Sequence, residues 1–299
     1  MSSSAIQSPF HQDCLRGKVA LVTGGGSGIG FQIARQLGLH GASVVIMGRR
    51  EKFLSEAVDQ LRADGVAASF FTGDVRSRES AEASVAFTVK TYGRMDTLVN
   101  GAAGNFLANA HELKLKGFKT VMEIDTVGVF NMSSAAFPAL RESGAGAIIN
   151  ITMTLHYGAT WFQAHASAAK AAIDSLTRHV RRAPGASLAM EWGSYGIRVN
   201  GIAPGPIADT PGMAKLSVGL GRDDANKHIP LGRMGTTFDI GMGAVFLVSS
   251  AASYVSGDTL VVDGAEWMYK EPLLKPEAVS RMSRAVEQRS RAMGPTSKL

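Results

Sequence analysis

The chain of 299 residues has the length of one large α/β domain, and its apolar content of 45% is enough for a sizeable core. Its net charge of +6 comes without a run of roughly five like charges, so no nucleic-acid-binding tail is expected, and a polyanionic small molecule would suit the excess. A single cysteine, Cys14, excludes an intrachain disulfide and a cysteine-based metal site, and no apolar run of about eighteen residues predicts a membrane span.

Short apolar runs alternate along the chain with segments of helical periodicity. Such alternation predicts an α/β fold, a Rossmann-type doubly wound parallel sheet with helices on both faces. We expect a single domain over residues 17–268, preceded by an N-terminal arm at 1–16. The predicted strands are 18–23, 43–47, 68–72, 97–100, 147–151, 197–202 and 259–262. The predicted helices are 28–38, 54–61, 81–92, 168–179 and one long helix at 118–140.

The C-terminal segment 269–299 has a different composition. Residues 277–292 predict a charged helix with a thin apolar stripe, either a surface helix or a partner-binding tail. The sequence ends in Ser297, Lys298 and Leu299, the tripeptide that the peroxisomal import receptor reads. We therefore expect the import receptor as a partner and the peroxisomal matrix as the location.

A glycine-rich segment follows the first predicted strand and opens the first predicted helix. Glycines let the backbone turn sharply and approach a pyrophosphate, and a helix N-terminus offers N–H groups and a positive dipole end. The placement therefore predicts a dinucleotide site. Its residues are Gly24, Gly25, Gly26, Ser27, Gly28, Ile29 and Gly30.

The end of the second strand indicates which dinucleotide binds. An NAD site carries an acidic residue there for the ribose hydroxyls, whereas this chain has Arg49 and Arg50. Two guanidinium groups suit a 2′-phosphate, so NADP(H) is the expected cofactor. Further cofactor positions follow the next two strands, namely Asp74 and Val75 by the adenine, and Asn100, Ala102 and Gly104 where the cofactor passes.

These motifs resemble the short-chain dehydrogenase/reductase family over roughly residues 17–268. The resemblance implies that the chain forms a homo-oligomer. It also implies that Lys170, Pro204, Gly205, Pro206, Ile207 and Thr210 contact the cofactor.

Three positions depart from the usual pattern of that family. Ala166 stands where the family has its acidic Tyr, Met153 falls at the position of its Ser, and Asp125 at that of its Asn. The ordinary machinery for interconverting alcohols and ketones is therefore absent.

Residues 102–107, 118–122, 124–125 and 203–207 resemble one branch of the family, the peroxisomal 2,4-dienoyl-CoA reductases. The resemblance implies NADPH-dependent reduction of 2,4-dienoyl-CoA to trans-3-enoyl-CoA, an auxiliary step in the β-oxidation of unsaturated fatty acids. The implied contacts to a fatty acyl-CoA substrate come from Arg49, Arg76, Phe106, Lys114, Leu115, Lys116 and Lys215.

This reaction is compatible with the missing Tyr. Reduction of a conjugated thioester places negative charge on the thioester oxygen, and the proton is then added to carbon. We expect the Lys170 ammonium to stabilise this charge, Asp125 to hold Lys170 or a proton-relaying water, and Asn105 to bond the thioester oxygen. Tyr157 is an alternative proton donor, and His165 is expected to point elsewhere.

An insertion at 181–188 interrupts the helix after Lys170, because adjacent Pro and Gly do not continue a helix. It is either looped out or the product of a mis-spliced gene model. Two other functions stay open, another short-chain reductase of enoyl or 3-oxoacyl thioesters and a non-catalytic NADP-binding relative.

Overall fold

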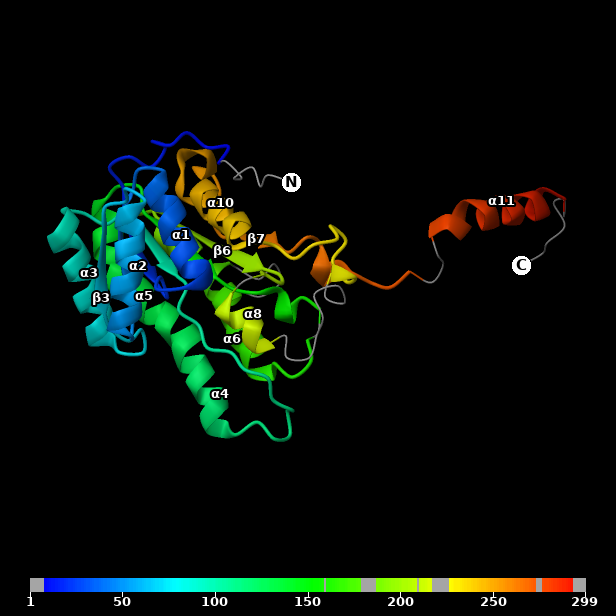
Figure 1. The fold of residues 1–299 in the computed structure, drawn as a ribbon, viewed down its shortest axis with the longest axis horizontal. Coiled ribbons are helices and arrows are strands. Elements are labelled where there is room, and N and C mark those ends of the chain that lie inside the picture. The colour runs from blue at the N-terminus through cyan, green and yellow to red at the C-terminus, as the bar shows by residue number, and fades with distance from the viewer. Residues whose placement is uncertain are drawn as a thin grey trace. The chain divides into compact units, whose positions relative to one another are not determined.

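The computed structural model describes residues 8–158, 160–178, 187–208, 210–216, 226–272 and 276–292. The chain divides into two compact units, Met1–Trp267 and Met268–Leu299. The first unit is an α/β domain (Figure 1). The predicted insertion at 181–188 lies outside the described residues except for its last two positions.

Seven parallel strands form one sheet, as predicted. Their order is β3-β2-β1-β4-β5-β6-β7, so the direction of strand addition reverses between β1 and β4. Open α/β sheets bind ligands beyond the carboxyl ends of the strands at such a switch point. The strands are β1 Val19–Thr23, β2 Ser43–Gly48, β3 Ala68–Thr72, β4 Thr97–Asn100, β5 Ala147–Ile151, β6 Arg198–Pro204 and β7 Thr259–Val262.

Helices connect the strands on both faces of the sheet, which confirms the predicted Rossmann-type architecture. The first four helices are α1 Gly28–Leu39, α2 Glu51–Ala63, α3 Arg78–Tyr92 and α4 Leu115–Met122. The helices that follow in this unit are α5 Gly128–Glu142, α6 Ala164–Thr177, α7 Leu188–Gly193, α8 Pro211–Leu216 and α10 Thr237–Val248.

Each inner strand contributes to two apolar cores, because successive side chains of a strand point to opposite faces. Val22 and Ile46 pack with α1, α2 and α10 on one face. Leu21 and Val45 pack with α3 and α5 on the other. Figure 1 shows α1 and α10 side by side over the first core. The sheet is therefore buried on both sides, and only its ends are open to ligands.

The helix predicted at 118–140 is interrupted by a π-helical turn, Glu123–Val127, between α4 and α5. The prediction of one uninterrupted α-helix was wrong here, because apolar periodicity does not resolve a single widened turn. Such turns occur most often at functional sites. This one contains Asp125, which is buried.

Helix α10 was not predicted, because its sequence is apolar on nearly every side and shows no helical stripe. A capping box begins it: the Thr236 hydroxyl accepts from the Asp239 N–H, and the Asp239 carboxylate accepts from the Thr236 N–H. The helix packs against α1, and the first residues of α1 belong to the glycine-rich loop.

The second unit contains α11, Pro276–Ala292, which confirms the predicted charged helix. Its apolar stripe is exposed, with Val279, Met282 and Val286 each at least 46% accessible. Among the residues described, no helix is long and apolar enough to cross a bilayer.

Candidate active site

The glycine-rich loop makes close backbone contacts that side chains would prevent. A Cβ on Gly24, which has φ +69°, would lie 2.6 Å from the Gly101 oxygen, and one on Gly30 would collide with the Gly24 carbonyl. The Ser27 side chain makes no capping hydrogen bond, so the first turn of α1 lacks a side-chain cap. A backbone floor that meets an uncapped helix N-terminus fits a pyrophosphate.

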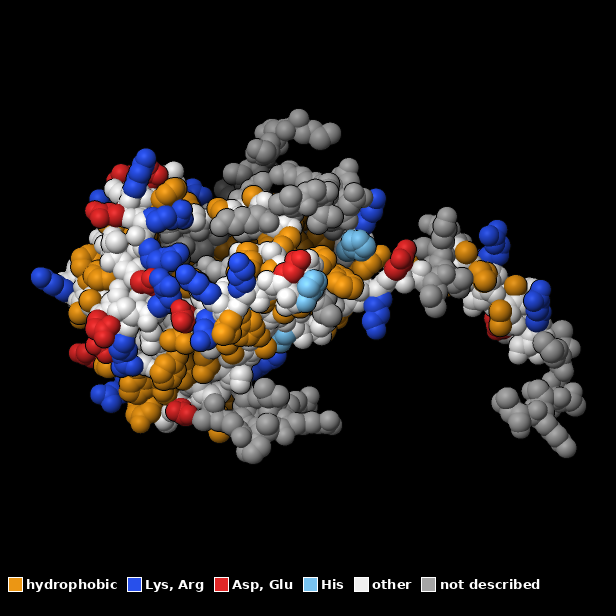
Figure 2. Space-filling view, turned by 90° about the horizontal axis from the view of Figure 1, so that it is seen from below, with side chains coloured by type: hydrophobic (Ala, Val, Ile, Leu, Met, Phe, Trp, Pro, Cys, Tyr) orange, Lys and Arg blue, Asp and Glu red, His pale blue; other side chains and the backbone are white. Residues whose placement is uncertain are grey.

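Two exposed arginines follow β2. The Arg50 guanidinium lies 4.2 Å from the centroid of the Phe53 ring, so one face of its plane is already stacked. Arg49 is near enough to Asp74 for its charge to add to the lowering of that carboxyl's pKa. Figure 2 shows basic side chains gathered beside an apolar area on one face of the molecule.

Two of the predicted ligand-binding residues, Asp74 and Arg76, pair with each other. The Arg76 guanidinium donates to both carboxylate oxygens, at 2.5 and 3.1 Å, and the Arg76 backbone N–H donates to Oδ1 at 3.0 Å. These hydrogen bonds are the main reason why the pKa of Asp74 is lowered. The pair keeps a carboxylate and a guanidinium together after β3, where the adenine end of a dinucleotide is expected.

The Asn100 side chain, at the end of β4, points into the protein. Its amide nitrogen donates to Asn150 Oδ1 at 2.8 Å and to the Ser133 hydroxyl at 3.2 Å, while its own buried oxygen has no partner among the described residues. The predicted cofactor contact at Asn100 would therefore involve its backbone. Ala102 and Gly104 follow it in a loop without regular structure.

A buried ion pair occupies the centre of the site. Lys170 Nζ lies 2.7 Å from Asp125 Oδ1 and donates to the Ile151 carbonyl at 3.0 Å. The side chains of Lys170 and Asp125 are only 5% and 1% exposed. The second carboxylate oxygen, Oδ2, accepts the Gly104 N–H at 2.8 Å. The lysine and the carboxylate are thus held in one orientation by α6, β5 and the loop after β4.

The loop after β4 is attached to the segment that precedes α6. The Asn105 amide nitrogen donates to the buried Gln163 at 2.6 Å, and the Ala108 N–H donates to the Phe162 carbonyl at 2.9 Å. An amide nitrogen carries two N–H donors, and the structure shows a partner for one of them. The second N–H of Asn105 has no partner among the described residues. The sequence did not single out Gln163, because a Gln before a helix has no distinctive signal.

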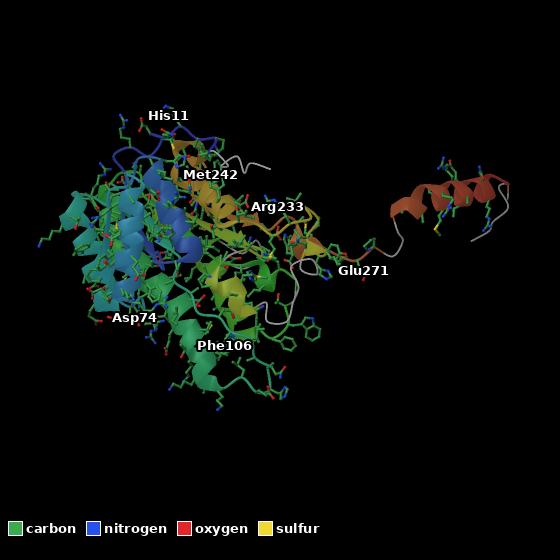
Figure 3. The ribbon with its side chains drawn as sticks, viewed as in Figure 1. His11, Asp74, Phe106, Arg233, Met242 and Glu271 are labelled. Carbon is green, nitrogen blue, oxygen red and sulfur yellow. The ribbon has the colours of Figure 1, made fainter. Side chains whose placement is uncertain are left out.

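His165 is fully buried and stacks on Phe106, with ring centroids 4.2 Å apart. Neither ring nitrogen has a hydrogen-bond partner of good geometry among the described residues. Burial lowers the pKa of His165, and the Phe106 backbone and the Asp125 charge offset this effect only in part. This side chain was expected to point elsewhere, but it stacks on Phe106, which lies near α4 in Figure 3.

The hydroxyl of Tyr157 is engaged away from the ion pair. It donates to Asp174 Oδ2 at 2.9 Å, and that oxygen also faces His156 Nε2 at 2.9 Å. Burial and the Asp174 charge raise the pKa of Tyr157. The structure therefore gives this phenol a structural role and does not support the alternative of a proton donor. Ala166, at the position of the family's Tyr, is buried.

The segment after β6 lies against the glycine-rich loop. Ile207 is bridged to Gly235, and the Thr210 hydroxyl accepts the Met213 N–H at the start of α8. A Cβ on Gly28 would lie 3.4 Å from Pro211 Cδ, in ordinary contact. The structure thus brings Thr210 and Pro211 beside the glycine-rich loop, and Asp209 lies outside the described residues.

The remaining substrate candidates lie on the surface. Lys114, Leu115 and Lys116 are exposed where α4 begins, and Leu115 is 67% accessible. The side chain of Lys215 lies outside the described residues. Exposed lysines suit the phosphates of a polyanionic ligand, but these side chains alone do not form a pocket.

The domain matches the family model described as enoyl-(acyl carrier protein) reductase over residues 24–264. The whole chain is 51% identical, over 98% of its length, to a peroxisomal 2,4-dienoyl-CoA reductase (3E-enoyl-CoA-producing) of Arabidopsis thaliana. The match covers the full length of that relative. The chain belongs to the short-chain dehydrogenase/reductase family. A relative of the same name from Rattus norvegicus is 44% identical, with 87% of each chain covered.

Solved structures of this family have the same fold. A gluconate 5-dehydrogenase of Burkholderia cenocepacia in complex with NADP and tartrate has a TM-score of 0.78, is 31% identical, and aligns with 87% of this chain and 99% of its own. An actinorhodin polyketide ketoreductase with NADPH also has a TM-score of 0.78, at 32% identity, with 84% and 98% covered. Family membership and these complexes support a nicotinamide cofactor for this chain.

The buried imidazole of His165 predicts a pH dependence of stability. Its folded-state pKa is lowered, so the unfolded chain binds more protons, and this site loses stability as the pH falls below about 6.5. We expect the variant His165→Phe, which keeps a ring under Phe106, to lose less stability than the unmodified chain between about pH 7.5 and 5.5. Urea unfolding at several pH values measures this.

The matched control is His111→Phe, because the His111 side chain is 82% exposed. It should leave the pH dependence of the unfolding free energy unchanged. A His165→Phe curve parallel to that of the unmodified chain would show that the imidazole does not titrate differently in the folded state.

Proposed function

We propose that the chain reduces 2,4-dienoyl-CoA to trans-3-enoyl-CoA with NADPH. The observation that carries this proposal is the buried Lys170–Asp125 pair, with Ala166 where the family has its phenolic acid. Without that acid, a carbonyl oxygen that is being reduced to an alcohol has no proton donor at the usual position. A fixed ammonium group can still stabilise the anionic thioester oxygen that forms when a conjugated diene is reduced. The names of the relatives agree with this assignment.

NADPH is the proposed cofactor because the two residues that follow β2 are exposed arginines, where an NAD site has an acidic residue. Arg50 is stacked on Phe53, which leaves its edge N–H groups for a phosphate. The glycine floor over Gly24–Gly30 fits the pyrophosphate, and the segment 204–210 would lie along the nicotinamide end. When bound, the nicotinamide supplies the hydride that adds to the far end of the diene.

The residues of this chain then have separate tasks. Lys170 places its positive charge beside the developing anion, and its bond to the Ile151 carbonyl keeps it from rotating away. Asp125 holds the ammonium on one side and the Gly104 N–H on the other, so that substrate binding does not require either group to reorganise. The second N–H of the Asn105 amide would bond the thioester oxygen. The proton is added to carbon, through a water that Asp125 orients.

We propose that the chain works in the peroxisomal matrix as a homo-oligomer. Relatives named as peroxisomal share this activity, and the C-terminal tripeptide fits the import receptor. Val127, the last residue of the π-helical turn, and Phe130 in α5 are 45% and 49% exposed, and a second copy would cover them.

Turnover of 2,4-hexadienoyl-CoA tests the proposed reaction. We expect the chain to oxidise NADPH, which is measured as a loss of NADPH absorbance. The product should be the trans-3-enoyl thioester, which is identified by the position of its double bond. Lys170→Met should lower kcat by about 100-fold or more, because it removes the charge that stabilises the anion. Oxidation of a 3-hydroxyacyl-CoA without reduction of the diene would indicate a different acyl-CoA reductase instead. Cofactor binding without any turnover would indicate a non-catalytic relative.

Lys18→Met is the matched control for Lys170→Met. Lys18 also forms an ion pair with an aspartate, at 3.2 Å from Asp96, but it precedes β1 at the opposite end of the sheet. We expect its kcat to stay within about twofold of the unmodified enzyme. Intact diene turnover in Lys170→Met would contradict the proposed mechanism.

The cofactor assignment predicts an effect at Arg49. Arg49→Ala should raise KM for NADPH by roughly 10- to 100-fold, the effect of losing one charge-assisted hydrogen bond, with little change in KM for NADH. Arg78→Ala, an exposed arginine paired with Glu82 on α3, should change neither. An equal rise in both KM values would argue against a 2′-phosphate contact. Steady-state kinetics with each cofactor provide the comparison.

The location is tested by the C-terminus, which lies outside the described residues. Deletion of Ser297–Leu299 from a fluorescent fusion should move the punctate signal to the cytosol, because the import receptor reads this tripeptide. Thr296→Ala should leave the signal punctate. If the truncated fusion stayed in puncta, another segment would have to carry the address.

A further inference from the structure

Four large apolar side chains are exposed on the loop after β4 and on the segment before α6. They are Phe106, Leu107, Trp161 and Phe162, which we call the aromatic rim. Trp161 is 81% exposed and Phe162 49%, and their ring centroids are 6.0 Å apart. Clustered apolar surface of this kind marks an interaction site more often than it serves folding. The rim therefore needs an apolar occupant.

Short hydrogen bonds connect the rim to the catalytic pair. The Ala108 N–H donates to the Phe162 carbonyl at 2.9 Å, which joins the two loops of the rim. On the same two loops, Asn105 is bonded to Gln163 at 2.6 Å. One residue earlier, the Gly104 N–H bonds to Asp125. The rim thus begins next to the reacting centre and is held in a fixed relation to it.

The backbone of Phe162 supports a functional reason for the rim. Phe162 has φ +63°, a left-handed conformation that bulky side chains rarely adopt. Such strain is usually kept where it positions a functional group. Here the strained residue is still 49% exposed, so full burial of its ring does not compensate for the strain.

We propose that the aromatic rim binds the part of the acyl chain that extends beyond the diene, and so sets the preference for long-chain substrates. This inference rests on the proposed function. The rim follows β4 and β5, whereas the arginines proposed for the cofactor phosphate follow β2 on the other side of the switch point. A dienoyl group placed at Lys170 must continue onto surface near Asp125, and the rim offers apolar surface there that matches an alkyl chain.

A series of chain lengths tests the rim. Trp161→Ala should raise KM for 2,4-octadecadienoyl-CoA by about tenfold, the effect of two methylene groups leaving an apolar contact. KM for 2,4-hexadienoyl-CoA should change by less than about twofold, because its chain ends near the diene. Trp161→Phe should restore most of the long-chain KM. Tyr254→Ala, which removes a fully exposed aromatic side chain outside the rim, should affect neither substrate.

Three results would overturn the assignment. Equal changes in KM for both chain lengths would place the rim on the CoA portion, and unchanged values would leave it without a role in binding. Dissociation of the Trp161→Ala variant in size-exclusion chromatography would make the rim a subunit interface. Failure of the proposed function shows separately, because the unmodified chain would then not turn over hexadienoyl-CoA at all.

Discussion

A buried ion pair between a lysine and an aspartate fixes the geometry of the site. Removing two charges from water is costly, and such pairs rarely add net stability to a fold. Lys170 also bonds to the Ile151 carbonyl, and Asp125 also bonds to the Gly104 N–H. The arrangement offers a positive charge that is already oriented and shielded from solvent, which is what an anionic transition state needs.

Several other features near this pair are unfavourable for folding. The helix that carries Asp125 widens into a π-helical turn, and Phe162 takes a left-handed backbone. His165 and Asn100 bury polar atoms that have no partner among the described residues. Each feature costs stability where it occurs. These features lie on the π-helical turn, on the end of β4, and on α6 and the segment before it, which agrees with a site selected for chemistry.

The loop after β4 links binding to catalysis. Its first residues bond to Asp125 and Gln163, and its later residues carry the exposed side chains of the aromatic rim. A ligand that moves this loop would also move the Gly104 N–H that helps to hold the catalytic carboxylate. Substrate contacts at Phe106 would therefore be felt at Lys170 through two contacts, from Gly104 to Asp125 and from Asp125 to Lys170.

The sequence by itself predicted the seven strands and the glycine-rich loop, because alternating patterns and glycine spacing depend on local geometry. The roles of Lys170 and Asp125 came from the resemblance to the family and stay predictions. The sequence could not show that Asn100 points inward or that Asp74 pairs with Arg76. It also predicted a plain helix across the π-helical turn and left Tyr157 open as an alternative proton donor, whereas the structure shows its hydroxyl donating to Asp174. Only the tertiary structure decided these points, because which polar groups meet depends on packing between segments far apart in the chain. The same is true of the aromatic rim, whose two loops are 54 residues apart at Ala108 and Phe162 and meet only because β4 and β5 are neighbours in the sheet.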